Sequence, residues 1–160
     1  MNQNFQITPI HSSQVDHILH LSETDYAKLG VVKMIVAEKP GYPCRVSLAD
    51  AEIGEEVFLF PYQHHATASP YQSTGPIFIR KNVLTAQLAV NETPLFLQHR
   101  LLSLRGYDTH GMMQNAKTIA GTLLTTSILE LFEHAAIDYI QIHNASYGCY
   151  MCQVNRVIPC

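Results

Sequence analysis

Short runs of alternating or uniformly apolar residues follow one another along most of the chain. Alternation with a period of two is typical of half-buried strands, and a short run that is apolar on both faces is typical of a central strand. The segment 57–60 is of the second kind. Strands are predicted at 5–7, 31–37, 44–48, 57–60, 76–81, 101–107, 139–143 and 149–157. The segment 111–120 is ambiguous, and we favour a strand there.

Three other segments carry helical signals. Ser22 is a typical N-cap and Gly30 a typical C′ residue, so a helix is predicted over 23–29. Two further helices are predicted at 94–99 and 122–134. Strands outnumber helices, and most connections are too short for helical crossovers. We therefore predict a single α+β domain over residues 1–160, with a mainly antiparallel sheet and a few packed helices.

Composition and charge narrow the functional class. Hydrophobic residues make up 47% of the 160 residues, enough for a core, whereas charged residues make up only 14%. The net charge is −3 and the only adjacent basic pair is Arg80-Lys81, so we expect no nucleic-acid partner. No run approaches the ~18 apolar residues of a spanning helix, so we expect no membrane partner. Because the N-terminus lacks the pattern of a secretory signal, we expect a cytoplasmic location.

The C-terminal part of the chain predicts a candidate catalytic pair. The residues 144–148 fit a five-residue hairpin loop, in which Gly148 is free to adopt a positive φ. Such a loop places His143 opposite Cys149, with Cβ atoms ~4.5–5.5 Å apart. An imidazole at that distance stabilises a thiolate, so Cys149 is the candidate nucleophile and His143 its base. Asn144 would orient the pair or donate a hydrogen bond to a developing oxyanion.

Other interpretations of these residues stay open. A free cysteine often packs as a small apolar residue, and a histidine in a strand often only satisfies hydrogen bonds. The spacing Cys149-x-x-Cys152 is also found in zinc and dithiol motifs, but residues three apart in a strand point to opposite faces. Because no second ligand pair accompanies the motif, we predict no metal site. The even number of cysteines would permit disulfides, which a cytoplasmic location disfavours.

Two arginines are candidates for binding an anionic substrate. Arg45 and Arg80 lie in predicted apolar strands, and a guanidinium binds carboxylate or phosphate through two parallel hydrogen bonds. The alternative is a structural ion pair with Asp50, Glu52 or Asp108.

The predicted loop 63–75 supplies further candidates. It carries His64 and Tyr71, which we expect to close over a small anionic ligand in a cleft beside the tip of the last hairpin. The adjacent His64 and His65 are also possible metal ligands, although neighbours in an extended chain point apart.

Three ordered stretches resemble a bacterial family catalogued as "domain of unknown function 1203". They are Lys39-Pro40-Gly41-Tyr42-Pro43-Cys44-Arg45-Val46-Ser47-Leu48 with Asp50-Ala51, Ser69-Pro70-Tyr71 leading to Gly75-Pro76-Ile77-Phe78-Ile79-Arg80, and His143-Asn144-Ala145 with Gly148-Cys149-Tyr150. The resemblance extends over nearly the whole chain and implies a single-domain bacterial protein. It carries over no catalytic role. The family pattern requires no cysteine at the position of Cys152, which disfavours the zinc and dithiol interpretations.

Together these patterns predict thiol-dependent acyl or group transfer on a small anionic substrate, without a cofactor. The first alternative is a non-enzymatic domain that binds the same kind of small molecule. The second is a protein-interaction or homodimerisation module, which a low surface charge and exposed tyrosines favour.

Overall fold

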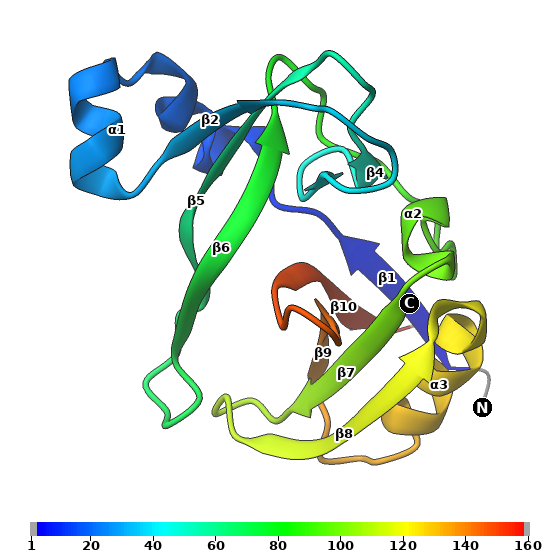
Figure 1. The fold of residues 1–160 in the computed structure, drawn as a ribbon. Helices are drawn as coiled ribbons and strands as arrows, with labels where there is room; N and C mark the ends of the chain where they lie inside the picture. Colours follow the sequence, from blue (N-terminus) through cyan, green and yellow to red (C-terminus); the bar gives the residue numbers. More distant parts are fainter. Residues whose placement is uncertain (1–2, 159–160) are drawn as a thin grey trace.

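Two five-stranded sheets form the framework of the molecule (Figure 1). The computed structural model describes residues 3–158. The strands are β1 (Asn4–Thr8), β2 (Val32–Ile35), β3 (Pro43–Cys44), β4 (Ala49–Asp50), β5 (Glu56–His65), β6 (Ser73–Arg80), β7 (Leu101–Tyr107), β8 (Met113–Ala120), β9 (Tyr139–Asn144) and β10 (Tyr150–Val157). The helices are α1 (Glu23–Leu29), α2 (Leu95–Gln98) and α3 (Leu124–Phe132), with 3-10 segments at Ser12–Gln14, Asp16–His20 and Gly121–Leu123.

The first sheet contains the two ends of the described chain. Its strand order is β1-β10-β9-β7-β8, and every neighbouring pair is antiparallel. One face carries the larger core, to which β7 contributes Leu102 and Leu104 and β9 contributes Ile140 and Ile142. Helix α3 adds four buried residues at helical spacing, as its sequence predicts: Leu124, Ile128, Leu131 and Phe132.

Within residues 3–158 no helix has the length and apolar character needed to cross a membrane.

The second sheet is built around the long β5–β6 hairpin. Its strand order is β2-β5-β6-β3-β4, and only the β3–β6 pair is parallel. Strand β5 is apolar on both faces, as predicted for a central strand. Phe58 and Phe60 enter a second core, against which Tyr26 of α1 packs. Val57 and Leu59 point to the opposite face, which the segment 36–55 partly covers.

The α+β fold class and the mainly antiparallel pairing are confirmed. Helix α1 has the predicted bounds, with Ser22 Oγ accepting a hydrogen bond from Asp25 N at 3.3 Å and Gly30 at φ 68°. Strand β7 also matches its predicted range, and the ambiguous segment 111–120 is mostly strand. These elements were predictable because caps and alternation are local signals.

The strand predicted over 44–48 is wrong. Strand β3 ends at Cys44, and the chain turns back so that Cys44 pairs with Ala49. Leu48 lies in the left-handed region at φ 48°. The four residues 43–46 are all buried, so the alternation read from the sequence does not correspond to two faces of a strand. Asp50 is buried too, and it forms an ion pair with Arg100.

The predicted loop 63–75 is shorter in the structure. Strand β5 continues through a bulge to His65, and strand β6 already begins at Ser73. Only residues 66–72 therefore connect the two strands. The connection packs on the turn after β7, where Ser69 Oγ donates to Gly111 O at 2.9 Å. None of the residues 66–72 lines the pocket that the tip of the last hairpin borders.

The contact between Gly121 and α2 gives a prediction about stability. A Cβ atom at Gly121 would lie 1.9 Å from the carbonyl oxygen of Leu97, so an alanine cannot fit unless the backbone moves. We expect Gly121→Ala to lower the free energy of unfolding by about 1–3 kcal/mol, measured by urea denaturation. Gly75→Ala is the control, because its nearest neighbour, His64 Nε2, lies 3.9 Å away. Equal losses in the two variants would mean that the close approach to Leu97 does not require a glycine.

Candidate functional site

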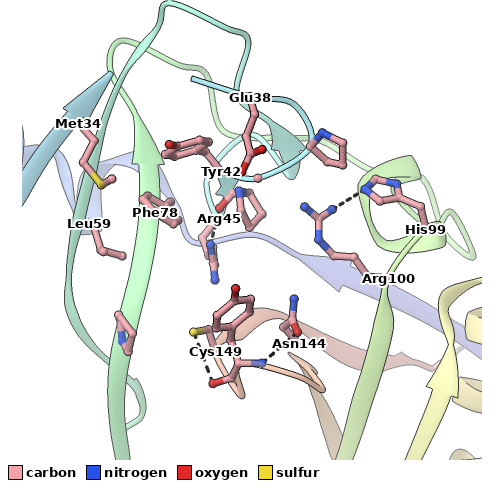
Figure 2. Close-up of a pocket in the computed structure, with 15 residues that line it drawn as sticks. Met34, Glu38, Tyr42, Arg45, Leu59, Phe78, His99, Arg100, Asn144 and Cys149 are labelled. Atoms are coloured by element: carbon pink, nitrogen blue, oxygen red, sulfur yellow. Dashed lines mark hydrogen bonds between the residues drawn. The ribbon is translucent and has the colours of Figure 1, made fainter. Parts of the chain in front are cut away.

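A pocket of about 680 Å³ lies between the second sheet and the tip of the last hairpin (Figure 2). This volume is typical of small-molecule sites. Four parts of the chain form its walls. They are the segment 38–45 around β3, one face of strands β2, β5 and β6, the residues after α2, and the tip of the β9–β10 hairpin. The lining residues are Met34, Glu38, Pro40, Gly41, Tyr42, Pro43, Arg45, Leu59, Pro76, Phe78, His99, Arg100, Asn144, Tyr147 and Cys149.

Arg45 is a buried cation in the wall of this pocket. The residue is only 2% exposed, and its guanidinium points toward the end of the last hairpin (Figure 2). Nε donates to Tyr150 O at 2.7 Å, and Nη1 donates to Pro43 O. Within residues 3–158 no carboxylate forms a salt bridge with Arg45, and Nη2 has no hydrogen-bond partner. Burial lowers the pKa of Arg45 to about 10, so the group remains a cation at neutral pH.

Two other arginines near this region are paired with carboxylates. Arg80 donates to both oxygens of Glu55, at 2.8 and 2.6 Å, and the pair raises the pKa of Arg80. Arg100 donates to both oxygens of Asp50, and its Nη1 also reaches the carbonyl of Phe96. The structural ion pair, one of the two predicted roles for Arg80, is thus present, although its partner is Glu55. Arg45 differs from both residues because its acceptors are uncharged.

The tip of the last hairpin presents Asn144 and Cys149 to the pocket. Asn144 Oδ1 accepts hydrogen bonds from the backbone of Ser146 at 3.0 Å and of Tyr147 at 3.3 Å, which fixes the start of the loop. Gly148 adopts φ 79°, as expected for the end of this turn. Cys149 is partly exposed, and its sulfur lies 3.9 Å from Tyr147 O.

The predicted pairing of His143 with Cys149 is wrong by one residue. In the β9–β10 ladder His143 pairs with Tyr150, and an irregularity follows between Tyr150 and Cys152. The loop closes through Asn144 N, which donates to Cys149 O at 2.9 Å. Such an irregularity shifts the register and reverses which face a side chain occupies, and periodicity alone cannot reveal it.

His143 is instead fully buried between the two sheets. Its Nδ1 donates to Gly148 O at 2.9 Å, and its Nε2 lies 3.1 Å from Gln141 Oε1. Burial lowers the pKa of His143 to about 3, and the bond to Gly148 offsets only part of this effect. Among the described residues no hydrogen bond joins His143 to the Cys149 sulfur, so the geometry does not support His143 as the base of that thiol.

A layer of histidine and tyrosine rings joins the two sheets beside His143. His64 of β5 stacks on Tyr150 of β10 with ring centroids 5.2 Å apart, and its Nδ1 contacts Gln141 Oε1 at 3.0 Å. His65 donates through Nδ1 to Tyr71 O at 2.8 Å and accepts a hydrogen bond from the Tyr139 hydroxyl at 2.7 Å. Both histidines therefore have protein partners for their rings, and these residues hold the sheets together.

Comparison with protein-family models identifies the relationship of this chain to other proteins. The model described as "Protein of unknown function (DUF1203)" matches residues 41–156. The chain belongs to this DUF1203 family. Comparison with curated proteins and with solved structures gave no match. The DUF1203 match includes Arg45, Asn144 and Cys149, whereas Met34, Glu38 and Pro40 of the pocket precede it.

The structure divides the predicted site residues into two groups. Three line the pocket inside the DUF1203 region: Arg45, Asn144 and Cys149. Four do not line it: His143, His64 and Tyr71, which belong to the ring layer, and Arg80, which holds Glu55.

Sequence reasoning missed several residues of the pocket. Tyr42 and Phe78 form an edge-to-face pair with centroids 5.3 Å apart at its wall, and His99 and Tyr147 also line it. Tyr42 lies in the 39–48 motif, so that motif was the available signal. Nothing local in the sequence indicates His99, which reaches the pocket only because α2 packs beside β4.

The structure places Cys152 in the protein core. Cys152 is fully buried in the larger core, and burial raises the pKa of its thiol to about 12. This is the packing role that a free cysteine commonly has. In the part of the chain from 3 to 158, no group of three or more His, Cys, Asp or Glu side chains is arranged to hold a metal ion.

The buried His143 predicts a pH dependence of stability. The unfolded chain takes up a proton on this imidazole near pH 6.5, whereas the low pKa in the folded protein delays protonation until about pH 3. The neutral His143 therefore contributes its full stabilisation above pH 6.5. As the pH decreases from 6.5 to about 3, the free energy of unfolding falls by about 1.4 kcal/mol per pH unit. His143→Gln should reduce the slope of unfolding free energy against pH by that amount in this range, measured by urea denaturation. Identical slopes for the wild type and for a His143→Gln variant that is folded at pH 8 would contradict the assignment.

Proposed function

We propose that the pocket binds a small organic anion and that Arg45 holds its anionic group. The observation that carries this proposal is the contrast among the arginines. Arg80 and Arg100 each have a carboxylate from the protein, whereas Arg45 is buried in the pocket wall with only backbone carbonyls. A guanidinium has five N–H donors in a planar fork, so Arg45 has capacity for a carboxylate.

The energetics favour an anion over a neutral ligand. A buried charge without a counter-charge is costly, and a bound carboxylate would supply the missing charge. Hydrogen bonds to charged groups contribute about 1.5–3 kcal/mol, more than bonds between neutral groups. Of the lining residues only Glu38 carries a carboxylate, and Glu38 is exposed.

Asn144 is placed to assist in the same pocket. Its Oδ1 holds the hairpin loop, so the side-chain orientation is fixed. Its amide nitrogen has no hydrogen-bond partner among residues 3–158 and is a second donor for a bound anion.

Benzoate and the neutral benzamide are suitable probes for the proposed site. We expect the wild-type protein to bind benzoate at least about tenfold more tightly than benzamide, which corresponds to about 1.4 kcal/mol. Asn144→Asp should remove this preference, because the carboxylate can still accept both loop hydrogen bonds but adds a negative charge to the pocket that contains Arg45. Binding is measured by NMR titration or calorimetry.

Arg45→Lys and Arg80→Lys form a matched pair of variants. We expect Arg45→Lys to weaken benzoate binding, since an ammonium lacks the planar fork, and Arg80→Lys to leave it unchanged. Equal affinity for benzoate and benzamide in the wild-type protein would refute the proposal without reference to any variant.

A second candidate function is thiol chemistry on the bound anion. The observation in its favour is that Cys149 lines the same pocket and is partly exposed, while Cys44 and Cys152 are buried. The thiolate is the nucleophilic form of a cysteine, and the Arg45 cation lies in the wall of the same pocket. This version of the predicted group transfer needs a base other than His143.

Alkylation of Cys149 tests the second candidate. Attack of the sulfur on iodoacetate forms an S–C bond and releases iodide, and iodoacetamide reacts in the same way without a charge. In a Cys160→Ser background, we expect the ratio of the iodoacetate rate to the iodoacetamide rate to be about tenfold higher in the folded protein than in urea. Mass spectrometry with Cys149→Ser as control identifies the modified residue. The same ratio in both states would rule out anion-directed reactivity.

Two further expectations stay predictions within this proposal. A cytoplasmic location fits the free cysteines Cys44, Cys149 and Cys152. A role in homodimerisation or protein interaction finds support in the exposed Tyr147, which is 86% accessible at the tip of the last hairpin.

A further inference from the structure

One wall of the pocket is a row of apolar side chains on the second sheet. Leu59 of β5 pairs directly with Phe78 of β6, so both side chains point to the same face. Met34 of β2 pairs with Val57, two residues before Leu59, and therefore shares this face. Figure 2 shows Met34, Leu59 and Phe78 together on one side of the pocket, with Arg45 beside them.

This apolar row is not the core face of the sheet. The core face carries Phe58, Phe60, Ile77 and Ile79, which are all nearly fully buried. Met34, Leu59 and Phe78 on the opposite face are only half-buried, although the segment 36–55 covers part of that face. The pocket therefore keeps apolar surface in contact with water, and a ligand that covered this surface would be favoured by the hydrophobic effect.

The order of the strands places the residues of the apolar row at successively greater distances from Arg45. Arg45 follows β3, Phe78 lies on β6, Leu59 on β5 and Met34 on β2, and these four strands are consecutive neighbours. Arg45 N donates to Phe78 O at 3.1 Å, so the row begins directly beside Arg45. Three strand spacings, about 14 Å, separate Arg45 from Met34 at the far end of the row.

From this arrangement we infer that the ligand is an aliphatic carboxylic acid whose chain lies across the second sheet. The carboxylate binds the guanidinium of Arg45, and the hydrocarbon chain extends over Phe78 and Leu59 toward Met34. The inference rests on the proposed function, since it places the anionic group at Arg45. It adds that the affinity depends on the length of the apolar chain.

A series of straight-chain acids from acetate to octanoate tests the inference. Burial of each methylene group should tighten binding about fourfold, so the logarithm of Kd should fall linearly with chain length until the row is covered. Binding is measured by calorimetry or by NMR titration at one pH above 6.5, where the acids are ionised.

Three variants separate the role of Arg45, which binds the carboxylate, from the role of the apolar row, which contacts the hydrocarbon chain. Arg45→Lys should weaken all acids by a similar factor and leave the slope unchanged. Leu59→Gln should flatten the slope while preserving the affinity for acetate. Leu84→Gln makes the same chemical change at a residue that is 89% exposed and outside the pocket, so it should behave as the wild type. If Leu59→Gln does not fold, Met34→Gln on the edge strand β2 replaces it.

The possible results distinguish the two proposals. A wild-type protein that binds acetate and octanoate equally well overturns the inference and leaves the proposed anion site intact. A slope that Leu59→Gln and Leu84→Gln reduce equally also overturns it, because the chain would then lie elsewhere. If none of the acids binds and benzoate does not bind either, the proposed function itself fails.

Discussion

The hydrogen bonds of the Arg45 guanidinium are the constraint on which the site depends. One acceptor, Pro43 O, belongs to the second sheet, and the other, Tyr150 O, belongs to the first. A buried cation requires acceptors with good geometry, so the two sheets must meet at one separation for both bonds to form. The same bonds fix the orientation of the guanidinium and leave its remaining edge directed at the pocket. The position of the cation is therefore set by the fold itself.

The layer of rings between the sheets complements the hydrogen bonds of Arg45. His64, His65 and His143 have buried polar partners, and those partners are amide, carbonyl and hydroxyl groups. The hydrogen bonds of these three histidines thus involve no carboxylate, and burial lowers the pKa of His143 enough to keep it neutral at physiological pH. Polar interiors of this kind specify one arrangement, because any shift leaves several groups unsatisfied at once. The tip of the last hairpin, with Asn144 and Cys149, is held against this layer.

The sequence could predict the local elements and some of the site, but not how distant residues meet. Helix α1 was predictable from Ser22 and Gly30, and β7 from its alternation, because each signal lies within the element. The pairing of His143 depended on a bulge, which changes the register without any change in the apolar pattern. The turn after Cys44 could not be predicted, because Arg45 completes an alternating pattern of apolar and polar residues although its side chain is buried. Arg45 and Cys149 were recognised as chemically suitable, yet only the packing of the two sheets shows that they share a pocket with Tyr42 and His99.

The link between Arg45 and Tyr150 O also has a consequence for the order of folding. The two residues are 105 positions apart, and β1 likewise pairs with β10 at the other end of the sequence. Contacts so distant along the chain form late, since the intervening polymer must first be ordered. During synthesis the arginine is made long before its acceptor, and it stays hydrated until the final strand has docked. The pocket wall that contains Arg45 is therefore completed in the last stage of assembly, when the whole polypeptide reaches its native topology.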